Sequence, residues 1–220
     1  MPRTLAPWER VERSIQTRYR KEIWTPFTTA VKEYRLLPAG CRVAVPVRGE
    51  QRFALLAVLL RMLQRYSSVP ITVRFFRADD GDAAERLGLP LTEAADCDRL
   101  AGPECFSDAT ETLFGSLLEE DILRGVPPAE RQGERLLVRP LLLIPRDRIA
   151  AWDRSNGLAL DPPPVRQRTR ALLDELKRRH PNAEISIYRS AQNVWPDTFP
   201  GWRKDGKAVP FSDIYDRKGN

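Results

Sequence analysis

The chain has 220 residues, of which 42% are hydrophobic and 30% are charged, with a formal net charge of +6 and a pI near 9.5. This length suits one sizeable domain with terminal additions, and the apolar content excludes a disordered chain. No apolar run approaches the roughly 20 residues of a membrane span, and the charged stretch around Glu9 and Arg10 does not resemble a secretory signal. We therefore expect a soluble cytoplasmic protein without a membrane partner.

Apolar residues at helical spacing predict two helices between residues 7 and 37, which would form an N-terminal helical arm over residues 1–38. A β-branched run predicts a buried strand at 42–47, and a strongly apolar helix is predicted at 52–66. A second strand is predicted at 71–76. A strand–helix–strand unit of this kind indicates parallel pairing with a right-handed crossover.

The next hundred residues continue the alternation of helices and strands. Weaker signals predict a helix at 82–87, a strand remnant at 89–91, a helix at 108–118, a strand at 136–138 and a helix at 146–155. Alternating elements are typical of an α/β fold, which we assign to residues 39–160. This fold would be a small parallel sheet flanked by helices.

Residues 161–220 are predicted to form a basic helix at 166–179 and a tail that packs on the α/β domain. The positive side chains here could follow a polyanion backbone. The alternative is a solvated helix face, because Asp174 and Glu175 lie on the same helix. The candidate RNA-binding residues are Arg166, Arg168, Arg170, Lys177, Arg178, Arg203, Lys204 and Lys207.

The three cysteines, Cys41, Cys97 and Cys105, have spacings that match no zinc or disulfide framework. We interpret them as reduced thiols without a catalytic role. No metal site is predicted from the residues alone.

The loop after the first predicted strand, residues 48–53, lies where open α/β sheets bind ligands. In the order and spacing of residues 19–27, 42–47, 106–113, 139–144, 189–194 and 204–207, the chain resembles the TtcA-like tRNA 2-thiocytidine synthetases. These belong to the PP-loop ATP pyrophosphatases. The resemblance implies a HUP-like sheet, ATP with magnesium, an iron–sulfur cluster and a tRNA substrate.

The phosphate loop of that family, Ser-Gly-Gly-Lys-Asp-Ser, falls on residues 48–53, where only Gly49 matches. Glycines let backbone N–H groups approach a phosphate, and the lysine neutralises its charge. Glu50 brings a carboxylate instead, although Arg48 and Arg52 leave room for anion binding of a different geometry. The resemblance therefore implies a vestigial nucleotide or anion site.

Two further signatures of the family are changed. His-His-Phe-Asp-Asp falls on residues 104–108, where the histidines are absent but Asp108 remains, followed by Glu111. An acid at a helix start with a glutamate three residues later is also an ordinary capping pattern. A family segment with Cys-x-x-Cys is missing between residues 96 and 102, as is the later cysteine near Asp161. Because iron–sulfur clusters need thiolate ligands, we expect no cofactor.

These changes favour a shortened, catalytically degenerate relative, or pseudoenzyme, that binds RNA, a partner protein or an anion and has no catalytic residues. One alternative is an active ATP-dependent tRNA-modifying enzyme that uses Arg48, Arg52 and Asp108 in an altered loop. Another is a purely structural subunit that binds no nucleic acid. Loss of a strand would expose a sheet edge, which predicts a homodimer or a heteromer with a full-length relative.

Overall fold

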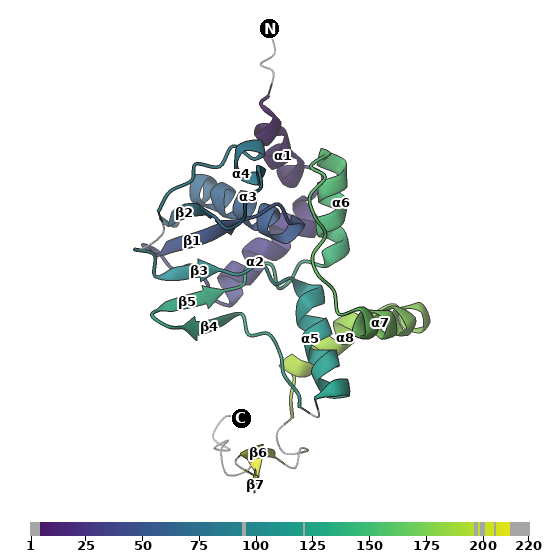
Figure 1. The fold of residues 1–220 in the computed structure, drawn as a ribbon. Coiled ribbons are helices and arrows are strands. Elements are labelled where there is room, and N and C mark those ends of the chain that lie inside the picture. The colour runs from purple at the N-terminus through teal and green to yellow at the C-terminus, as the bar shows by residue number, and fades with distance from the viewer. Residues whose placement is uncertain are drawn as a thin grey trace.

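The computed structural model describes residues 5–93, 96–120, 122–195, 198, 201–204 and 206–211. Its centre is a five-stranded sheet with the order β2-β1-β3-β5-β4 (Figure 1). All neighbouring strands are parallel except β4, which is antiparallel to β5. The strands are β1 (Arg42–Val47), β2 (Thr72–Arg77), β3 (Arg99–Ala101), β4 (Ala129–Gln132) and β5 (Arg135–Val138). The predicted α/β class is confirmed.

Strand β1, which pairs with β2 and β3, is apolar and buried along its whole length after Arg42, as is typical of a parallel strand that is covered on both faces. The crossover from β1 to the parallel strand β2 is α3 (Gln51–Tyr66), whose apolar side chains Leu55, Leu56 and Leu59 are fully buried. Among the described residues, no helix is both long and apolar enough to cross a membrane.

Residues 5–38 contain α1 (Pro7–Gln16), a π-helix η1 (Arg20–Trp24) and α2 (Thr25–Glu33). Their apolar side chains, including Ile15 and Phe27, lie in the same hydrophobic cluster as β1 and α3. The hydroxyl of Tyr19 donates a hydrogen bond of 2.9 Å to the carbonyl of Ala151 in α6 (Arg146–Asn156). This helical arm is therefore part of the main core.

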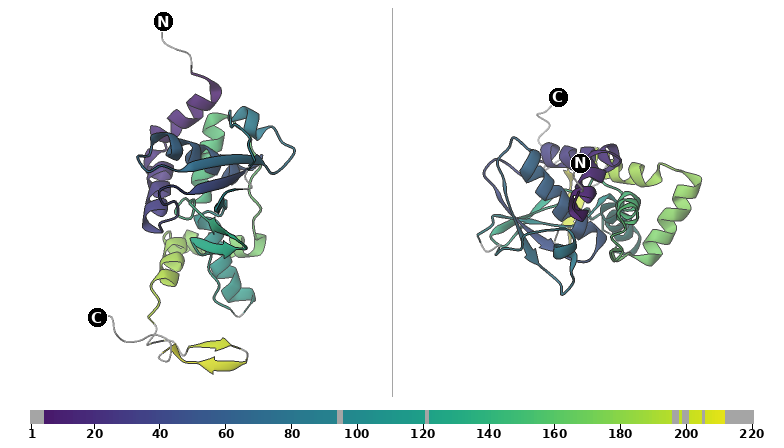
Figure 2. Two further views of the ribbon diagram at one scale, coloured as in Figure 1. Left: turned by 90° about the vertical axis from the view of Figure 1, so that its left-hand side faces the viewer. Right: turned by 90° about the horizontal axis from the view of Figure 1, so that it is seen from above.

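A second group of helices lies beside the sheet (Figures 1 and 2). It consists of α5 (Phe106–Glu119), α7 (Gln167–Arg179) and α8 (Ala183–Gln192), and each of these helices contacts the other two. A short helix, α4 (Ala83–Arg86), follows β2. A small hairpin of β6 (Trp202–Lys204) and β7 (Lys207–Val209) lies apart from the sheet.

Several elements differ from the sequence-based expectation. The strand remnant predicted at 89–91 contributes only a single bridge between Leu91 and Phe75, whereas the strand between β1 and β5 is Arg99–Ala101. Three residues are too few to show the alternation that marks a strand. The hairpin strand β4, the helix α8 and the β6–β7 hairpin were not predicted, because their sequences are short or mostly polar.

A buried ion pair joins the arm to α3. The carboxylate of Glu12, whose side chain is 4% exposed, accepts hydrogen bonds from Arg61 Nε at 2.7 Å and Arg65 Nη1 at 3.1 Å. Arg61 is itself buried and also donates to the carbonyls of Leu87 and Gly88. Arg65 is about half exposed. The two arginines thus share one carboxylate but differ in their access to water.

We expect Arg61→Met to lower the free energy of unfolding by about 3–5 kcal/mol, because it leaves the Glu12 carboxylate buried without its main partner. Arg65→Met is the matched control and should lower it by less than about 1 kcal/mol, because an exposed pair contributes little. Urea unfolding of the two variants measures the difference. Equal losses would contradict a special role for the buried pair.

Candidate nucleotide and anion site

The loop that joins β1 to α3 carries Glu50 at the N-cap of the helix. Its backbone is extended, and its Oε1 accepts a hydrogen bond of 3.0 Å from the backbone N–H of Arg52. Helix N-termini attract anions because their first N–H groups have no partner within the helix. At the N-terminus of α3, the Glu50 carboxylate of the chain itself takes the place of a bound anion.

The other backbone N–H groups of this loop also have acceptors within the chain. Gly49 N donates to Asp79 Oδ2 at 2.8 Å, and Gln51 N donates to the carbonyl of Asp161 at 3.0 Å. Asp161 N in turn donates to the carbonyl of Gly49 at 2.8 Å. The amides of Gly49, Gln51 and Arg52 are therefore engaged before any phosphate arrives.

Behind the loop, acidic and basic side chains alternate in a buried row. Arg52 bonds both oxygens of Glu50, at 2.8 and 2.7 Å, and Asp108 Oδ2 at 2.8 Å. Arg146 bonds Asp108 Oδ1 at 2.6 Å and both oxygens of Glu111, at 2.5 and 3.0 Å. We call Glu50, Arg52, Asp108, Arg146 and Glu111 the charge row. Each of its side chains is at most 14% exposed.

Contacts within the charge row favour the ionised forms of Asp108, Arg52 and Arg146. Burial alone would raise the pKa of Asp108, but the charge of Arg52 and hydrogen bonds from Cys105 N, Arg52 and Arg146 together hold that pKa below its ordinary value. Burial opposes the charge on Arg52 and on Arg146, yet their hydrogen bonds to carboxylates raise the pKa of both. Asp108, Arg52 and Arg146 are therefore charged at neutral pH.

The structure brings together three of the five residues predicted for this site, Arg52, Asp108 and Glu111, and places Gly49 at the edge of the loop. Arg48 is exposed, and its guanidinium lies 5.0 Å from the centre of the Phe53 ring. Sequence reasoning missed Arg146, whose only signal was its place at the start of a predicted helix. It also missed Asp79 and Asp161, which no local pattern connects with the loop.

The residues predicted to bind RNA do not form one surface. Arg170 and Lys177 both contact Glu184, whereas Arg178 pairs with Glu175 on its own helix. Arg166 lies 3.8 Å from a carboxylate oxygen of Glu120, and Arg168 is exposed. Arg203 and Lys207 belong to the hairpin, which lies away from α7, and the side chain of Lys204 is outside the described residues (Figure 1).

All three cysteines are buried and unpaired, and burial raises the pKa of each thiol. Neutral buried thiols are poor nucleophiles and poor metal ligands. In the part of the chain that the structure describes, no group of three or more His, Cys, Asp or Glu residues could hold a metal ion. The described residues therefore do not fit an iron–sulfur cluster, which needs thiolates.

We expect Asp108→Asn to lower the free energy of unfolding by about 3–5 kcal/mol, because it leaves Arg52 and Arg146 buried without their shared carboxylate. Asp147→Asn is the matched control: its side chain is 72% exposed, so the change should stay within about 0.5 kcal/mol. Chemical denaturation at neutral pH compares the two variants.

The pH dependence gives a second measurement of the same variant. Because the pKa of Asp108 is lower in the folded than in the unfolded protein, its contribution is present above the unfolded pKa of about 3.9 and is lost as the pH falls through the folded value. The loss of stability between neutral pH and pH 3 should therefore be smaller in Asp108→Asn than in the wild type. Parallel curves would contradict this role.

We expect Gly49→Ala to leave stability unchanged or to raise it by up to about 1 kcal/mol, because Gly49 has no positive φ and an added Cβ would meet only Asp79 Oδ2, at 3.8 Å. Gly88→Ala is the contrast, since Gly88 has a φ of 59° and an added Cβ would lie 2.8 Å from Trp8 Cδ1. It should lower the melting temperature clearly. Equal melting temperatures for the two variants would contradict this reasoning.

Comparison with known proteins connects this geometry to a family, although no protein-family model matches the chain. The tRNA-cytidine(32) 2-sulfurtransferase of Anaeromyxobacter sp. (strain Fw109-5) is 24% identical over 232 residues, covering 80% of this chain and 77% of the relative. The enzyme of the same name from Alkalilimnicola ehrlichii is 24% identical over 223 residues, covering 76% and 71%. The one from Pseudomonas putida (strain F1) is 30% identical over 126 residues, covering 49% and 46%.

Among solved structures, the U34-tRNA thiolase NcsA from Methanococcus maripaludis, with its [4Fe-4S] cluster, shares the fold with a TM-score of 0.59. It is 14% identical, and the match covers 82% of this chain and 80% of the thiolase. This finding overturns the expectation of no cofactor, which rested only on missing cysteines, because a protein of the same fold was solved with a cluster.

The sequence matches extend over most of the chain. The chain is TtcA-like: it is similar in sequence to the tRNA-cytidine(32) 2-sulfurtransferases and shares its fold with a tRNA thiolase.

Proposed function

We propose that this chain is a tRNA-binding member of its family that does not use ATP at the family's nucleotide position. One observation carries the proposal. The amides of Gly49, Gln51 and Arg52 and the N-terminus of α3 are already occupied by carboxylates and a carbonyl of the chain itself. On this hypothesis the chain is a pseudoenzyme.

A phosphate at this loop would have to compete with Glu50. If the carboxylate stayed, two negative charges about 4 Å apart would repel each other by about 1–4 kcal/mol across water-like and surface-like dielectrics. If it moved, Arg52 would lose the partner that it now bonds through both carboxylate oxygens. Either course opposes nucleotide binding. The lysine that would favour it in the family is replaced by Gln51, which donates a hydrogen bond to Asp153 instead.

The proposal of a tRNA ligand rests on the relatives and on charge. The relatives are named as tRNA sulfurtransferases, and the chain carries a formal net charge of +6. Positive proteins bind nucleic acids in part by releasing the counterions of the phosphates.

Self-association stays a prediction. The end of α5 and the turn after it expose apolar side chains that a second copy or a full-length relative could cover. Leu117, Leu118 and Leu123 are 57%, 49% and 57% exposed. Exposed apolar groups of this kind often lie at interfaces.

We expect ATP with magnesium to leave the melting temperature unchanged, whereas a ligand at 100 times its Kd would stabilise the protein by about 2.7 kcal/mol. Fluorescence anisotropy should show that labelled tRNA binds and that its affinity falls as the salt concentration rises. Stabilisation by ATP, or release of pyrophosphate from it, would instead identify an active enzyme with an altered loop. Absence of salt-sensitive tRNA binding would support a structural subunit.

A further inference from the structure

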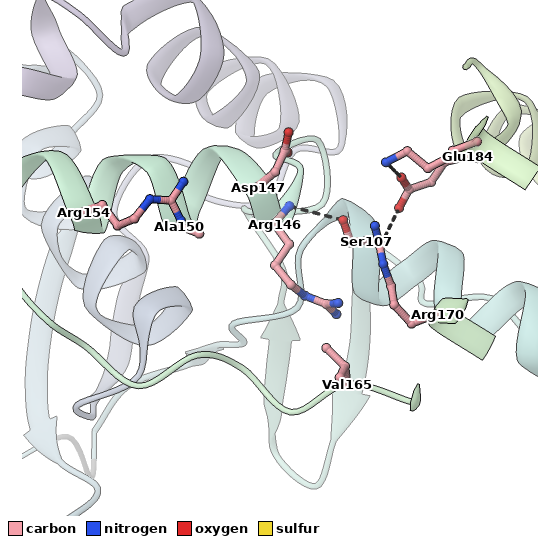
Figure 3. Close-up of a pocket in the computed structure, with 9 residues that line it drawn as sticks. Ser107, Arg146, Asp147, Ala150, Arg154, Val165, Arg170 and Glu184 are labelled. Atoms are coloured by element: carbon pink, nitrogen blue, oxygen red, sulfur yellow. Dashed lines mark hydrogen bonds and ion pairs between the residues drawn. The ribbon is translucent and has the colours of Figure 1, made fainter. Parts of the chain in front are cut away.

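A cavity of about 390 Å³ lies between α6 and α7, next to the charge row but distinct from the loop at residues 48–53 (Figure 3). We call it the α6–α7 cavity. Four of its side chains are cationic and two are carboxylates. It is lined by Ser107, Arg146, Asp147, Ala150, Arg154, Val165, Arg170, Lys177 and Glu184.

Both carboxylates are already engaged. Glu184, whose side chain is 6% exposed, receives Lys177 Nζ at 2.8 Å and Arg170 Nη1 at 3.5 Å. Asp147 accepts a hydrogen bond from the backbone N–H of Arg148 and lies 3.8 Å from its Nε, so that it partners a residue outside the cavity. Figure 3 shows the Asp147 side chain on the opposite side of α6 from the Arg146 guanidinium.

Two cationic donors remain without acceptors. Within the described part of the chain, Arg154 forms neither an ion pair nor a side-chain hydrogen bond, and the buried Nε of Arg146 has no hydrogen-bond partner. Arg146, Ala150 and Arg154 are four residues apart and therefore lie on one face of α6. Figure 3 shows the Arg154 side chain extending along α6 toward Ala150. The small Ala150 side chain leaves space between the two arginines.

A neutral donor completes the cavity. The hydroxyl of Ser107 accepts a hydrogen bond of 3.2 Å from Arg146 N, which leaves its own hydrogen free to donate to an incoming oxygen. Guanidinium groups bond phosphate oxygens in pairs, and a hydroxyl donor adds to them. An anion with several acceptor oxygens matches this set of donors.

We propose that the α6–α7 cavity binds a phosphate group of an RNA backbone, with Arg154 as its principal ligand and Ser107 as a supporting donor. The RNA part of this inference rests on the proposed function. Inorganic phosphate offers the same chemistry from a second source, so the experiment has one arm for each.

The test compares Arg154→Ala with Arg148→Ala, which removes the same charge from another face of the same helix, where Arg148 pairs with Glu22. Labelled tRNA is titrated at several salt concentrations. We expect Arg154→Ala to weaken binding about tenfold at low salt and to reduce the salt slope by about one, because one charged contact is lost. Arg148→Ala should change neither. Inorganic phosphate should raise the melting temperature of the wild type and of Arg148→Ala, but not that of Arg154→Ala.

The outcomes separate this inference from the proposed function. If the wild type binds tRNA and both variants bind it equally, the cavity is not an RNA phosphate site, while the proposed function stands. If the wild type does not bind tRNA, the proposed function fails and the RNA part of the inference fails with it. If phosphate raises the melting temperature only when Arg154 is present, but Arg154→Ala binds tRNA as tightly as the wild type, the cavity binds a free anion. That result would overturn the inference for RNA.

Discussion

The structure depends on the mutual neutralisation of the charge row. Its carboxylates and guanidinium groups come from the starts of α3, α5 and α6 and from one turn further along α5, and all are largely removed from water. A buried charge is tolerated only beside a partner with good hydrogen bonds. Arg52 and Arg146 each bridge two carboxylates, so the loss of either arginine removes a hydrogen-bond partner from two buried carboxylates. The row therefore fixes how these three helices meet at the carboxyl ends of the parallel strands.

The charge row also determines what the loop after β1 can bind. Glu50 is held at the N-terminus of α3 by two interactions at once, the bond from the Arg52 amide and the paired bonds from its guanidinium. Further ion pairs connect the charge row to α7 and α8. Arg170 of α7 lies 3.5 Å from Glu111 and 3.5 Å from Glu184 of α8. Arg146 thus belongs both to the row and to the α6–α7 cavity. The loop after β1, whose N–H groups already have acceptors, and the cationic α6–α7 cavity are therefore connected through the charge row.

The elements that the sequence predicted well are those whose own residues determine their structure. The strand at 42–47 and the long helix after it have a continuous apolar character, which reflects burial on all sides. By contrast, β3 is three residues long and becomes a strand only through pairing with β1 and β5. In the site, Arg52, Asp108 and Glu111 were found by their positions in a family pattern. Arg146 was not, because its closeness to Asp108 arises from packing between elements 38 residues apart.

Gly49 shows why a matching motif residue does not by itself indicate a surviving site. It is the only residue of the family's phosphate loop retained here, yet its φ is not positive and an added Cβ would meet no atom closer than 3.8 Å. What a phosphate requires of such a loop is free N–H groups, and the Gly49 amide is bonded to Asp79. Ligand binding must then use groups that the fold leaves without partners. In the described chain the Arg154 guanidinium is such a group. It lies on α6, in the α6–α7 cavity, and not in the loop after β1.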